Sequence, residues 1–377
     1  MTRLFLIFHG RFPSEKAASL FAARSAEAFV REGIEVVLLV PKRKMETIDP
    51  RAFYGLKEIF PIIYLGTVDL FGFPIPKPIT FWIGYLTFSW ECKKYIRTHA
   101  TKSDSIYSNE LIPLWLVAPE FKNTFYEMHD FPESKHHIFK ILLRRMRWVL
   151  IHNRWKTAEA VRLFGINKAK LMTEPNAVDL HAFNSPLSRA EARKKLNLPM
   201  DIQIVGYTGH LYSWKGVDTL AAAAKLLPNL FFVFVGGTPE DYKKYQLHFT
   251  ATNIQWVGFR PPNEIPLWQR AADVLVLPNT AKQAISAYYT SPMKLFEYMA
   301  SGTPVIASRI PSVEEIVSDE SVTYFEPDSV DSLVVAIQTA LTDETTSAQK
   351  AKRAQEEIQS HTWDKRAGRI IAFMRSS

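Results

Sequence analysis

Only one cysteine, Cys92, occurs in the 377 residues of this sequence, which excludes an intrachain disulfide. A lone cysteine fits a reducing compartment. Long apolar runs are also missing. The most apolar stretch, from Leu70 to Trp90, is interrupted by Pro74, Pro76, Lys77 and Pro78. Its unbroken part, Ile79–Trp90, is shorter than the roughly 20 residues that span a bilayer. The first apolar run, Leu4–Phe8, is too short for a signal peptide, so we expect a cytoplasmic protein.

Several motifs of catalysis and metal binding are absent as well. The sequence contains no Asp-x-Asp and no G-x-S-x-G elbow, and neither common phosphate-loop fingerprint fits it. His136 and His137 lack the spaced cysteines or carboxylates of a zinc site. Cys92 has no recognisable local partner for nucleophilic catalysis. We therefore expect no metal, no cofactor and no covalent intermediate on cysteine or serine.

Negative charge is scarce in the first half of the chain. Residues 1–185 hold 26 Lys and Arg against 18 Asp and Glu, whereas residues 186–377 hold 20 of each. The whole excess of eight positive charges therefore lies in the first half. Such an excess suits an acidic partner, namely a phosphorylated substrate, nucleic acid or an anionic membrane. Mild basicity also occurs in proteins without any such partner.

The remaining pattern is that of a globular α/β protein, with 47% hydrophobic and 22% charged residues. A strand over Leu4–Phe8, a helix over Ala17–Glu32 closed by Gly33, and a strand over Glu35–Val40 form one crossover unit. The length indicates two domains. We predict two Rossmann-like doubly wound domains facing each other across a cleft, and ligands at the carboxyl ends of their strands.

The second half repeats this rhythm. Its expected strands are Ile202–Tyr207, Leu230–Val235, Asn253–Val257, Ala272–Leu277 and Pro304–Ala307, and its expected helices are Arg189–Leu196, Val217–Leu227 and Lys294–Met299. We place the join near 184–200. The predicted parts are a first domain 1–185, a second domain 186–362, and a terminal segment 363–377. The last of these holds a helix, Trp363–Met374, expected to pack back on the first domain.

The segment Tyr288–Pro304 has the signals of a helix that follows a loop. Ser291 is a suitable N-cap, Pro292 suits the first helical position, and Gly302 suits the end. Free N–H groups at such an end bind phosphate. Lys294 and Glu297 share a face, and a carboxylate there can accept hydrogen bonds from ribose hydroxyls. The same pattern also fits a capped surface helix with an ordinary ion pair.

A glycine-bracketed loop, Gly209–Gly216, lies between an expected strand and an expected helix and carries a single lysine, Lys215. A positioned ammonium group can stabilise the charge that develops on a leaving nucleoside diphosphate. An ordinary glycine-rich turn with a solvated lysine is the alternative.

These two segments occur together with several others. They are Glu174–Phe183, Val257–Arg260 with Glu264–Pro266, Ala271–Pro278, Tyr126–Asp130, and Gly10 after the first strand. The set resembles the family-four, or group 1, retaining glycosyltransferases of the GT-B fold, and the resemblance covers most of the chain.

The resemblance implies catalytic roles for His129, near the donor sugar, and Lys215, on the donor diphosphate. It implies a ribose-binding role for Glu297. The donor-binding set that it implies is Gly10, Gly209, His210, Lys215, Phe259, Arg260, Ser291, Pro292, Met293, Lys294, Leu295 and Glu297. From the residues alone, His129 also fits a loop histidine that caps a turn. The resemblance agrees with a metal-independent reaction.

Three positions depart from the family pattern. His210 stands where an arginine is common, Tyr289 stands where a second acid lies eight residues before Glu297, and Ala177 replaces a glycine. Histidine is only partly protonated near neutral pH, so the diphosphate would depend more on Lys215 and the helix end. A nucleotide-sugar epimerase on the same scaffold is one alternative. A catalytically silent nucleotide-sugar-binding subunit is a second one, motivated by His210 and Tyr289.

The basic stretch from Lys135 to Lys156 includes Lys140, Arg144, Arg145, Arg147 and Arg154. It fits either a helix lying on an anionic membrane or a core-packing helix followed by the strand Trp148–Ile151. No nucleic-acid-binding module accompanies it. We therefore expect a retaining transferase with a UDP- or GDP-linked sugar donor and a glycan or lipid-linked hydroxyl acceptor. Peripheral contact with the inner face of a membrane is a further hypothesis.

Overall fold

The computed structural model describes residues 3–43, 48–70, 72–132, 134–184 and 186–376. The chain forms two compact units, of which the first contains Met1–Pro175 with Trp363–Ser377 and the second contains Asn176–Thr362. The first unit thus ends ten residues before the expected join, and position 185 lies outside the described residues. The physical reason is that Asn176 already hydrogen-bonds to Ser291 of the second unit.

The first unit is built on a seven-stranded sheet in the order β3-β2-β1-β4-β5-β6-β7, and all of its pairings are parallel. Its strands are β1 Arg3–Ile7, β2 Glu35–Pro41, β3 Ile62–Leu65, β4 Ser105–Ser108, β5 Thr124–Met128, β6 Trp148–Ile151 and β7 Leu171–Thr173. Its helices are α1 Ala17–Arg31, α2 Pro50–Tyr54, α3 Lys77–His99, α4 Leu111–Val117, α5 His136–Leu143, α6 Arg154–Phe164, the 3₁₀ turn η1 Lys168–Lys170 and α15 Trp363–Arg375.

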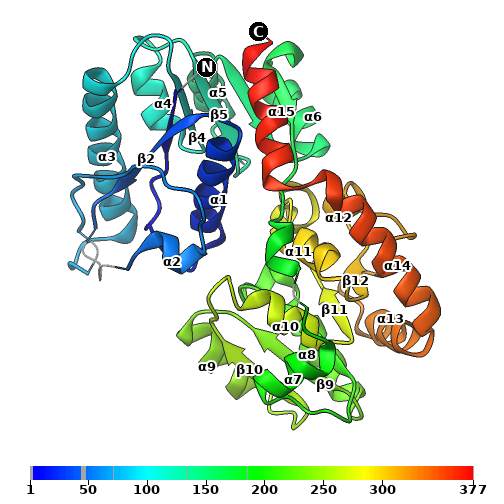
Figure 1. Cartoon of the computed structure of the whole chain (residues 1–377). Coiled ribbons are helices and arrows are strands. Elements are labelled where there is room, and N and C mark those ends of the chain that lie inside the picture. The colour runs from blue at the N-terminus through cyan, green and yellow to red at the C-terminus, as the bar shows by residue number, and fades with distance from the viewer. Residues whose placement is uncertain (1–2, 44–47, 71, 133, 185, 377) are drawn as a thin grey trace. The chain divides into compact units, whose positions relative to one another are not determined.

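Helices cover both faces of this sheet. Because each crossover is right-handed, α3, α4, α5 and α6 lie on one face, where neighbours in this series pack on each other, and α1 lies on the other. The terminal helix α15, in red in Figure 1, packs on α1. The last helix therefore packs on the first unit, as expected.

The second unit has a six-stranded parallel sheet in the order β10-β9-β8-β11-β12-β13. Its strands are β8 Ile204–Thr208, β9 Phe231–Val235, β10 Ile254–Gly258, β11 Val274–Leu277, β12 Val305–Ser308 and β13 Thr323–Phe325. Its helices are α7 Arg189–Leu196, α8 Val217–Leu226, α9 Pro239–His248, α10 Ile265–Ala271, α11 Met293–Ser301, α12 Pro311–Glu314, α13 Val330–Thr342 and α14 Glu344–Glu357. Shorter turns are η2 Leu180–Phe183, η3 Ser213–Lys215, the π-helical η4 Ile285–Tyr289 and η5 Ile358–Ser360.

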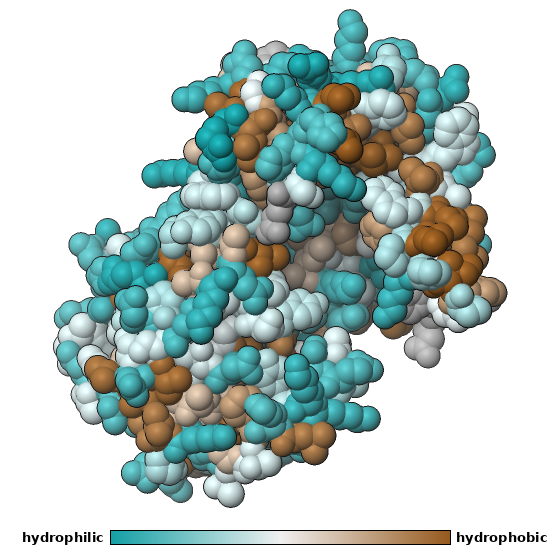
Figure 2. Space-filling view, turned by 180° about the vertical axis from the view of Figure 1, so that it is seen from behind, coloured by the Kyte–Doolittle hydropathy of each residue, from teal (hydrophilic) through white to brown (hydrophobic). Residues whose placement is uncertain are grey.

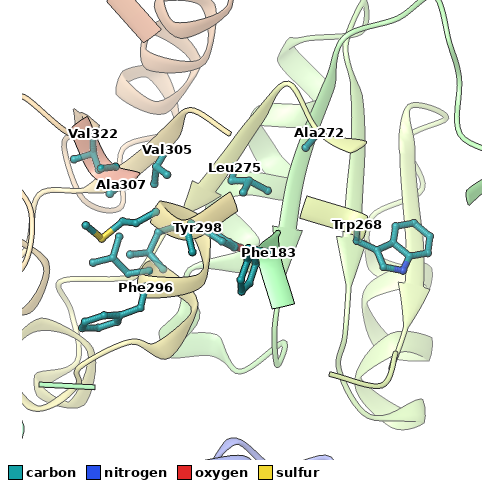
Figure 3. Packing of buried hydrophobic residues seen from close by; sticks show 14 of the residues in the cluster. Phe183, Trp268, Ala272, Leu275, Phe296, Tyr298, Val305, Ala307 and Val322 are labelled. Atoms are coloured by element: carbon teal, nitrogen blue, oxygen red, sulfur yellow. The ribbon is translucent and has the colours of Figure 1, made fainter. Parts of the chain in front are cut away.

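The core of the second unit fixes helix α11 in place. Figure 3 shows Phe296 and Tyr298 of this helix packed near Leu275 of β11 and Val305 of β12. All four side chains are buried, and Tyr298 Oη also accepts a hydrogen bond from the backbone N–H of Thr208 at 2.8 Å. Burial of this kind contributes roughly 1.5–3 kcal/mol for each large side chain. The N-terminal end of α11 is therefore held rigidly beside the end of β8.

Both units are doubly wound α/β domains, as the sequence predicts. Among the described residues, no helix combines the length and the apolar character that a membrane crossing requires. Cys92 is a free, buried residue of α3.

Candidate functional site

The strand order of the second unit changes direction between β8 and β11. From β8 the chain continues outward to β9 and β10, and from β11 it continues the other way to β12 and β13. Ligands of open parallel sheets bind at such a switch point, beyond the carboxyl ends of the strands. The loop after β8 holds Gly209 and Lys215, and α11, which follows the loop after β11, carries Lys294 and Glu297. The topology therefore brings together two segments that the sequence singled out separately.

Two glycines allow these segments to approach closely. Gly209 has a φ of +128°, and a Cβ atom there would lie 3.3 Å from Cε and Nζ of Lys294. Gly216 has a φ of +69°, and a Cβ atom there would lie 1.7 Å from the carbonyl oxygen of Pro278. Side chains at either position would be strained and would push the loop away. The two ends of the glycine-bracketed loop are therefore packed closely against neighbouring elements, whereas Tyr212 and Ser213 between them are exposed.

The amino groups of Lys294 and Lys215 lie near each other, and no carboxylate among the described residues forms an ion pair with either of them. Lys294 is buried, and its Nζ has no hydrogen-bond partner among the described residues and lies 3.9 Å from the centroid of the Tyr207 ring. Burial, and then the charge of Lys215, lower the pKa of Lys294 well below its usual value. Lys215 Nζ lies 3.8 Å from the centroid of the Trp214 ring, and burial lowers the pKa of Lys215 to about 7. An anion bound here would restore the charge of both groups.

Glu297 lies one turn further along α11. Burial raises its pKa to about 7, although the hydrogen bond from Gln269 and the charge of Lys294 act in the opposite direction. Gln269 Nε2 donates to Glu297 Oε2 at 3.3 Å and also lies 3.2 Å from Thr208 Oγ1. No local sequence signal marks Gln269, because its partners lie in other elements. Most of α11 is buried, so the alternative of a surface helix with a solvated ion pair is wrong.

The start of α11 differs from the expected one. The helix begins at Met293, Pro292 occupies the N-cap position, and no side chain caps it. Ser291, the expected N-cap, instead accepts a hydrogen bond at its Oγ from the backbone N–H of Asn176 at 3.2 Å, and Asn176 Nδ2 donates to its carbonyl oxygen. The prediction failed because a tertiary contact takes the hydroxyl that local sequence offers to the helix. Gly302, with a φ of +71°, ends the helix as predicted.

The other expected donor-binding residues of this unit are more dispersed. Leu295 is fully buried in the core, so its side chain cannot contact a ligand. The His210 ring stacks on Tyr212 with centroids 5.0 Å apart. Phe259 is 37% exposed in the loop after β10. Arg260, next to it, lies 4.0 Å from Glu264 and over the Trp268 ring.

In the first unit, Gly10 follows β1 and His129 follows β5. A Cβ atom at Gly10 would lie 2.3 Å from Cζ of Phe8, so a larger residue there would have to displace this ring. The His129 ring meets Phe21 edge-on at 4.5 Å, and its Nε2 lies 3.6 Å from Glu127 Oε1. Lys156 Nζ donates to the carbonyl oxygen of His129 at 3.0 Å. Both the backbone and the ring of His129 are therefore held in place.

Glu127 is the centre of a buried network that sequence reasoning missed. Arg366 of α15 and Tyr107 of β4 both donate to this carboxylate, and His152 Nε2 lies 2.7 Å from its Oε1. Burial alone would raise the pKa of Glu127, but Arg366 and the two histidines outweigh it and hold the pKa well below its usual value. Burial, and then the charge of Lys156, lower the pKa of His152 to about 3. The one sequence signal for this network is the presence of Glu127 inside the otherwise apolar strand β5.

Glu127, His129 and His152 are also metal-ligating residue types, and their ligand atoms lie within 4.8 Å of one another. The guanidinium group of Arg366 contacts the same oxygen of Glu127 and would repel a cation there. We therefore interpret this cluster as a hydrogen-bonded network that positions His129. Metal independence stays a prediction.

Residues 188–358 match the family of glycosyl transferases group 1. A D-inositol 3-phosphate glycosyltransferase of Corynebacterium glutamicum (strain R) is 25% identical over 210 residues, which cover 52% of this chain and 49% of that relative. The chain thus spans about half the length of this curated relative. Sucrose-phosphate synthase from Thermosynechococcus elongatus has a similar fold, with a TM-score of 0.78 at 21% identity over 100% of this chain and 99% of its own.

The Anabaena protein HepE, solved in complex with UDP and glucose, has a TM-score of 0.76 at 18% identity over 100% of both chains. At these identities, the solved structures establish the fold alone. Residues 188–358 therefore match the group 1 glycosyl transferases, and the two Rossmann-like units of the chain have the GT-B fold.

Proposed function

We propose that this protein is a retaining glycosyltransferase that moves a sugar from a UDP- or GDP-linked donor to a hydroxyl acceptor without a metal ion. The observation that carries the proposal is the pair Lys215 and Lys294, two poorly solvated cations beside Glu297 at the switch point of the second sheet. A nucleoside diphosphate supplies the negative charge that this pair lacks. The UDP named in the solved HepE complex supports a nucleotide donor.

Each residue then has a stated task. Lys215 and Lys294 hold the diphosphate oxygens and stabilise the charge that grows on them as the sugar leaves. Glu297 accepts hydrogen bonds from the ribose hydroxyls, and Gln269 orients its carboxylate. In the first unit, His129 faces the donor sugar, and Glu127 and Lys156 keep it in position.

The reaction exchanges one bond at the anomeric carbon for another. The bond from this carbon to the diphosphate oxygen breaks, a bond to the acceptor oxygen forms on the same face, and the acceptor proton passes to the departing diphosphate. We further propose a glycan or lipid-linked acceptor, a role in the synthesis of a cell-surface glycan or glycolipid, and peripheral contact with an anionic membrane. The relatives that are named as D-inositol 3-phosphate glycosyltransferases support a phosphorylated acceptor equally well.

A panel of UDP- and GDP-sugars tests the proposal. Nucleotide release is measured with and without glycan and lipid acceptors, and each reaction is repeated with EDTA. Acceptor-dependent release that survives EDTA is the expected result, with the anomeric configuration of the product read by NMR. Isomerisation of the sugar without an acceptor would indicate an epimerase, and binding without reaction would indicate a silent binding subunit.

The variant Glu297→Ala tests the assignment of the ribose site. It should weaken nucleotide binding, whereas Glu356→Ala, which removes an exposed acid of α14 in the same unit, should not. Equal nucleotide affinity in the two variants would contradict the role given to Glu297.

A further inference from the structure

Helix α3 of the first unit is apolar on two opposite sides. One side, with Tyr85, Phe88, Cys92 and Ile96, is buried in the unit. On the opposite side, Ile79, Trp82, Leu86 and Trp90 follow each other at spacings of three, four and four residues. Each of these four side chains is 51–52% exposed. We call these four residues the α3 face.

Such a helix is unusual for a surface element. The water-facing side of a surface helix is normally polar, and a helix that is apolar all round is normally covered on both sides. Here the large apolar side chains form one stripe, and the described residues of the first unit leave about half of each side chain uncovered. In the space-filling view, hydrophobic residues gather at the edge of the first unit where α3 lies (Figure 2). Exposed stripes of this kind mark interaction surfaces.

The stripe continues into positive charge. The next two positions on the same side of α3 are Lys93 and Arg97, and α3 as a whole has four Lys and Arg against one Glu. Two carboxylates moderate this charge, since Glu91 lies 2.8 Å from Lys94, and Glu120 lies 3.0 Å from Arg97. The exposed surface therefore changes from apolar to basic along one helix.

Helix α5 repeats this combination on the same face of the sheet, with α4 between the two. It exposes Ile138 and Ile141 beside Lys140 and Arg144, and residues 134–147 contain five Lys and Arg and no acid. Only part of the basic stretch from Lys135 to Lys156 contributes to this exposed surface. Lys156 is fully buried and bonded to backbone carbonyls, so it cannot contribute.

We propose that the α3 face is the membrane-docking surface of this protein and that it rests on an anionic lipid bilayer. Tryptophan suits the boundary between headgroups and acyl chains, because its ring is apolar and its N–H is polar. Lys93, Arg97, Lys140 and Arg144 would then meet the anionic headgroups, each adding up to about 1 kcal/mol, or about fivefold in partitioning. A second copy of the same face is a poor occupant, since pairing would oppose two sets of cations.

The inference rests on the proposed function in that it names the surface for the peripheral membrane contact proposed there, but it does not depend on transferase activity. Vesicle binding is therefore measured without donor or acceptor, so that it can fail or succeed independently of transferase activity. The full chain is sedimented with vesicles of phosphatidylglycerol and phosphatidylcholine, and separately with vesicles of phosphatidylcholine alone. We expect binding to the anionic vesicles and much weaker binding to the neutral ones.

The variant Trp82→Glu with Trp90→Glu should lower binding to anionic vesicles by at least about tenfold. The matched control is Leu247→Glu with Val335→Glu, which places the same charges at exposed apolar positions of the second unit, 81% and 61% exposed. The control should bind like the unchanged protein. Equal losses in both variants would overturn the proposal, because net charge alone would then explain them.

The electrostatic part has its own test. Lys140→Gln with Arg144→Gln should lower binding up to about thirtyfold at low salt, and the difference should shrink as salt screens the charges. Brominated lipids quench the fluorescence of tryptophans that they contact. They should therefore quench the tryptophan fluorescence of the unchanged protein more than that of the variant Trp82→Phe with Trp90→Phe. Failure of the unchanged protein to bind anionic vesicles would overturn the proposal. The proposal would also be overturned if the unchanged protein self-associated in sedimentation without binding vesicles, and if the Trp82→Glu, Trp90→Glu variant no longer self-associated.

Discussion

The candidate sites of the two units treat buried charge in opposite ways. In the first unit, Glu127 is surrounded by donors, and its negative charge is matched by Arg366. In the second unit, Lys215 and Lys294 lie beside aromatic rings, and Lys294 Nζ has no hydrogen-bond partner among the described residues. The first site is electrostatically complete, whereas the second is complete only with an anion.

This difference indicates that the charges of the first site maintain its geometry, whereas those of the second site bind a ligand. A matched buried charge fixes geometry and costs stability when either partner is removed. An unmatched one lowers stability in the free protein, and the energy is recovered when a ligand of opposite charge arrives. The comparison also clarifies the charge distribution, because the excess of positive charge lies in residues 1–185, while the cations suited to a diphosphate lie in the half with no net charge.

Breaking the matched pair should have the largest effect. Arg366→Met leaves the Glu127 carboxylate buried without its main partner and should lower the free energy of unfolding by about 3–5 kcal/mol. Arg309→Met, which removes a surface ion pair with Asp319, should cost at most about 1 kcal/mol. Urea unfolding measures both.

A double-mutant cycle checks the reason. Arg366→Met with Glu127→Met should be considerably less destabilised than the sum of the two single changes, because no charge is left uncompensated. Additive losses would show that packing of these side chains, and not their charges, accounts for the effect.

The unmatched lysines should matter most for the ligand. Lys294→Met should weaken UDP binding by about 1.5–3 kcal/mol, the usual worth of a hydrogen bond to a charged group. Lys225→Met is the matched control, since Lys225 also lies over an aromatic ring, that of Phe249, but is exposed on α8. Calorimetric titration with UDP measures both, and an equal affinity would remove Lys294 from the donor site.

The same substitution should act in the opposite direction on stability. Methionine has a similar shape and no charge to desolvate, so Lys294→Met should raise the free energy of unfolding of the nucleotide-free protein by about 1 kcal/mol. Added UDP should reverse the order, because only the unchanged protein gains from the bound anion. A destabilised, nucleotide-free Lys294→Met protein would show that the ammonium group has a structural role.

A further effect is a pH dependence. Burial lowers the pKa of Lys215 to about 7 in the folded chain, below its value in the unfolded chain, so the unfolded state binds more protons above pH 7. The contribution of this group to stability should therefore rise with pH from about 7 towards the unfolded pKa and fall on acidification. Unfolding of the nucleotide-free protein at pH 7 and pH 9 measures it, and Lys215→Met should remove this part of the slope.

Local signals predicted most of the fold. The helix over Ala17–Glu32 is observed at Ala17–Arg31, and Arg189–Leu196 begins with a capping box between Ser188 and Glu191. In both cases the apolar spacing and the residues at the ends act within one or two turns. Helix α3 extends past Pro78 because the prolines stand at its N-terminal end, where no backbone donor is lost.

Contacts between distant residues were not predictable in this way. Asn176 and Ser291 are 115 positions apart, and Glu127 and Arg366 are 239 positions apart. No single sequence states which carboxylate a distant guanidinium group will meet. The resemblance located the segments of the site, whereas the structure alone revealed Gln269, His152 and Arg366 behind them.

The position of α15 has a consequence for the order in which the protein can be completed on the ribosome. Domains generally fold in the order in which they are synthesised. Here Arg366 is made 239 residues after the carboxylate that it neutralises. The whole of the second unit is made between these two residues. The buried ion pair of the first unit can therefore form only after the second unit has been synthesised.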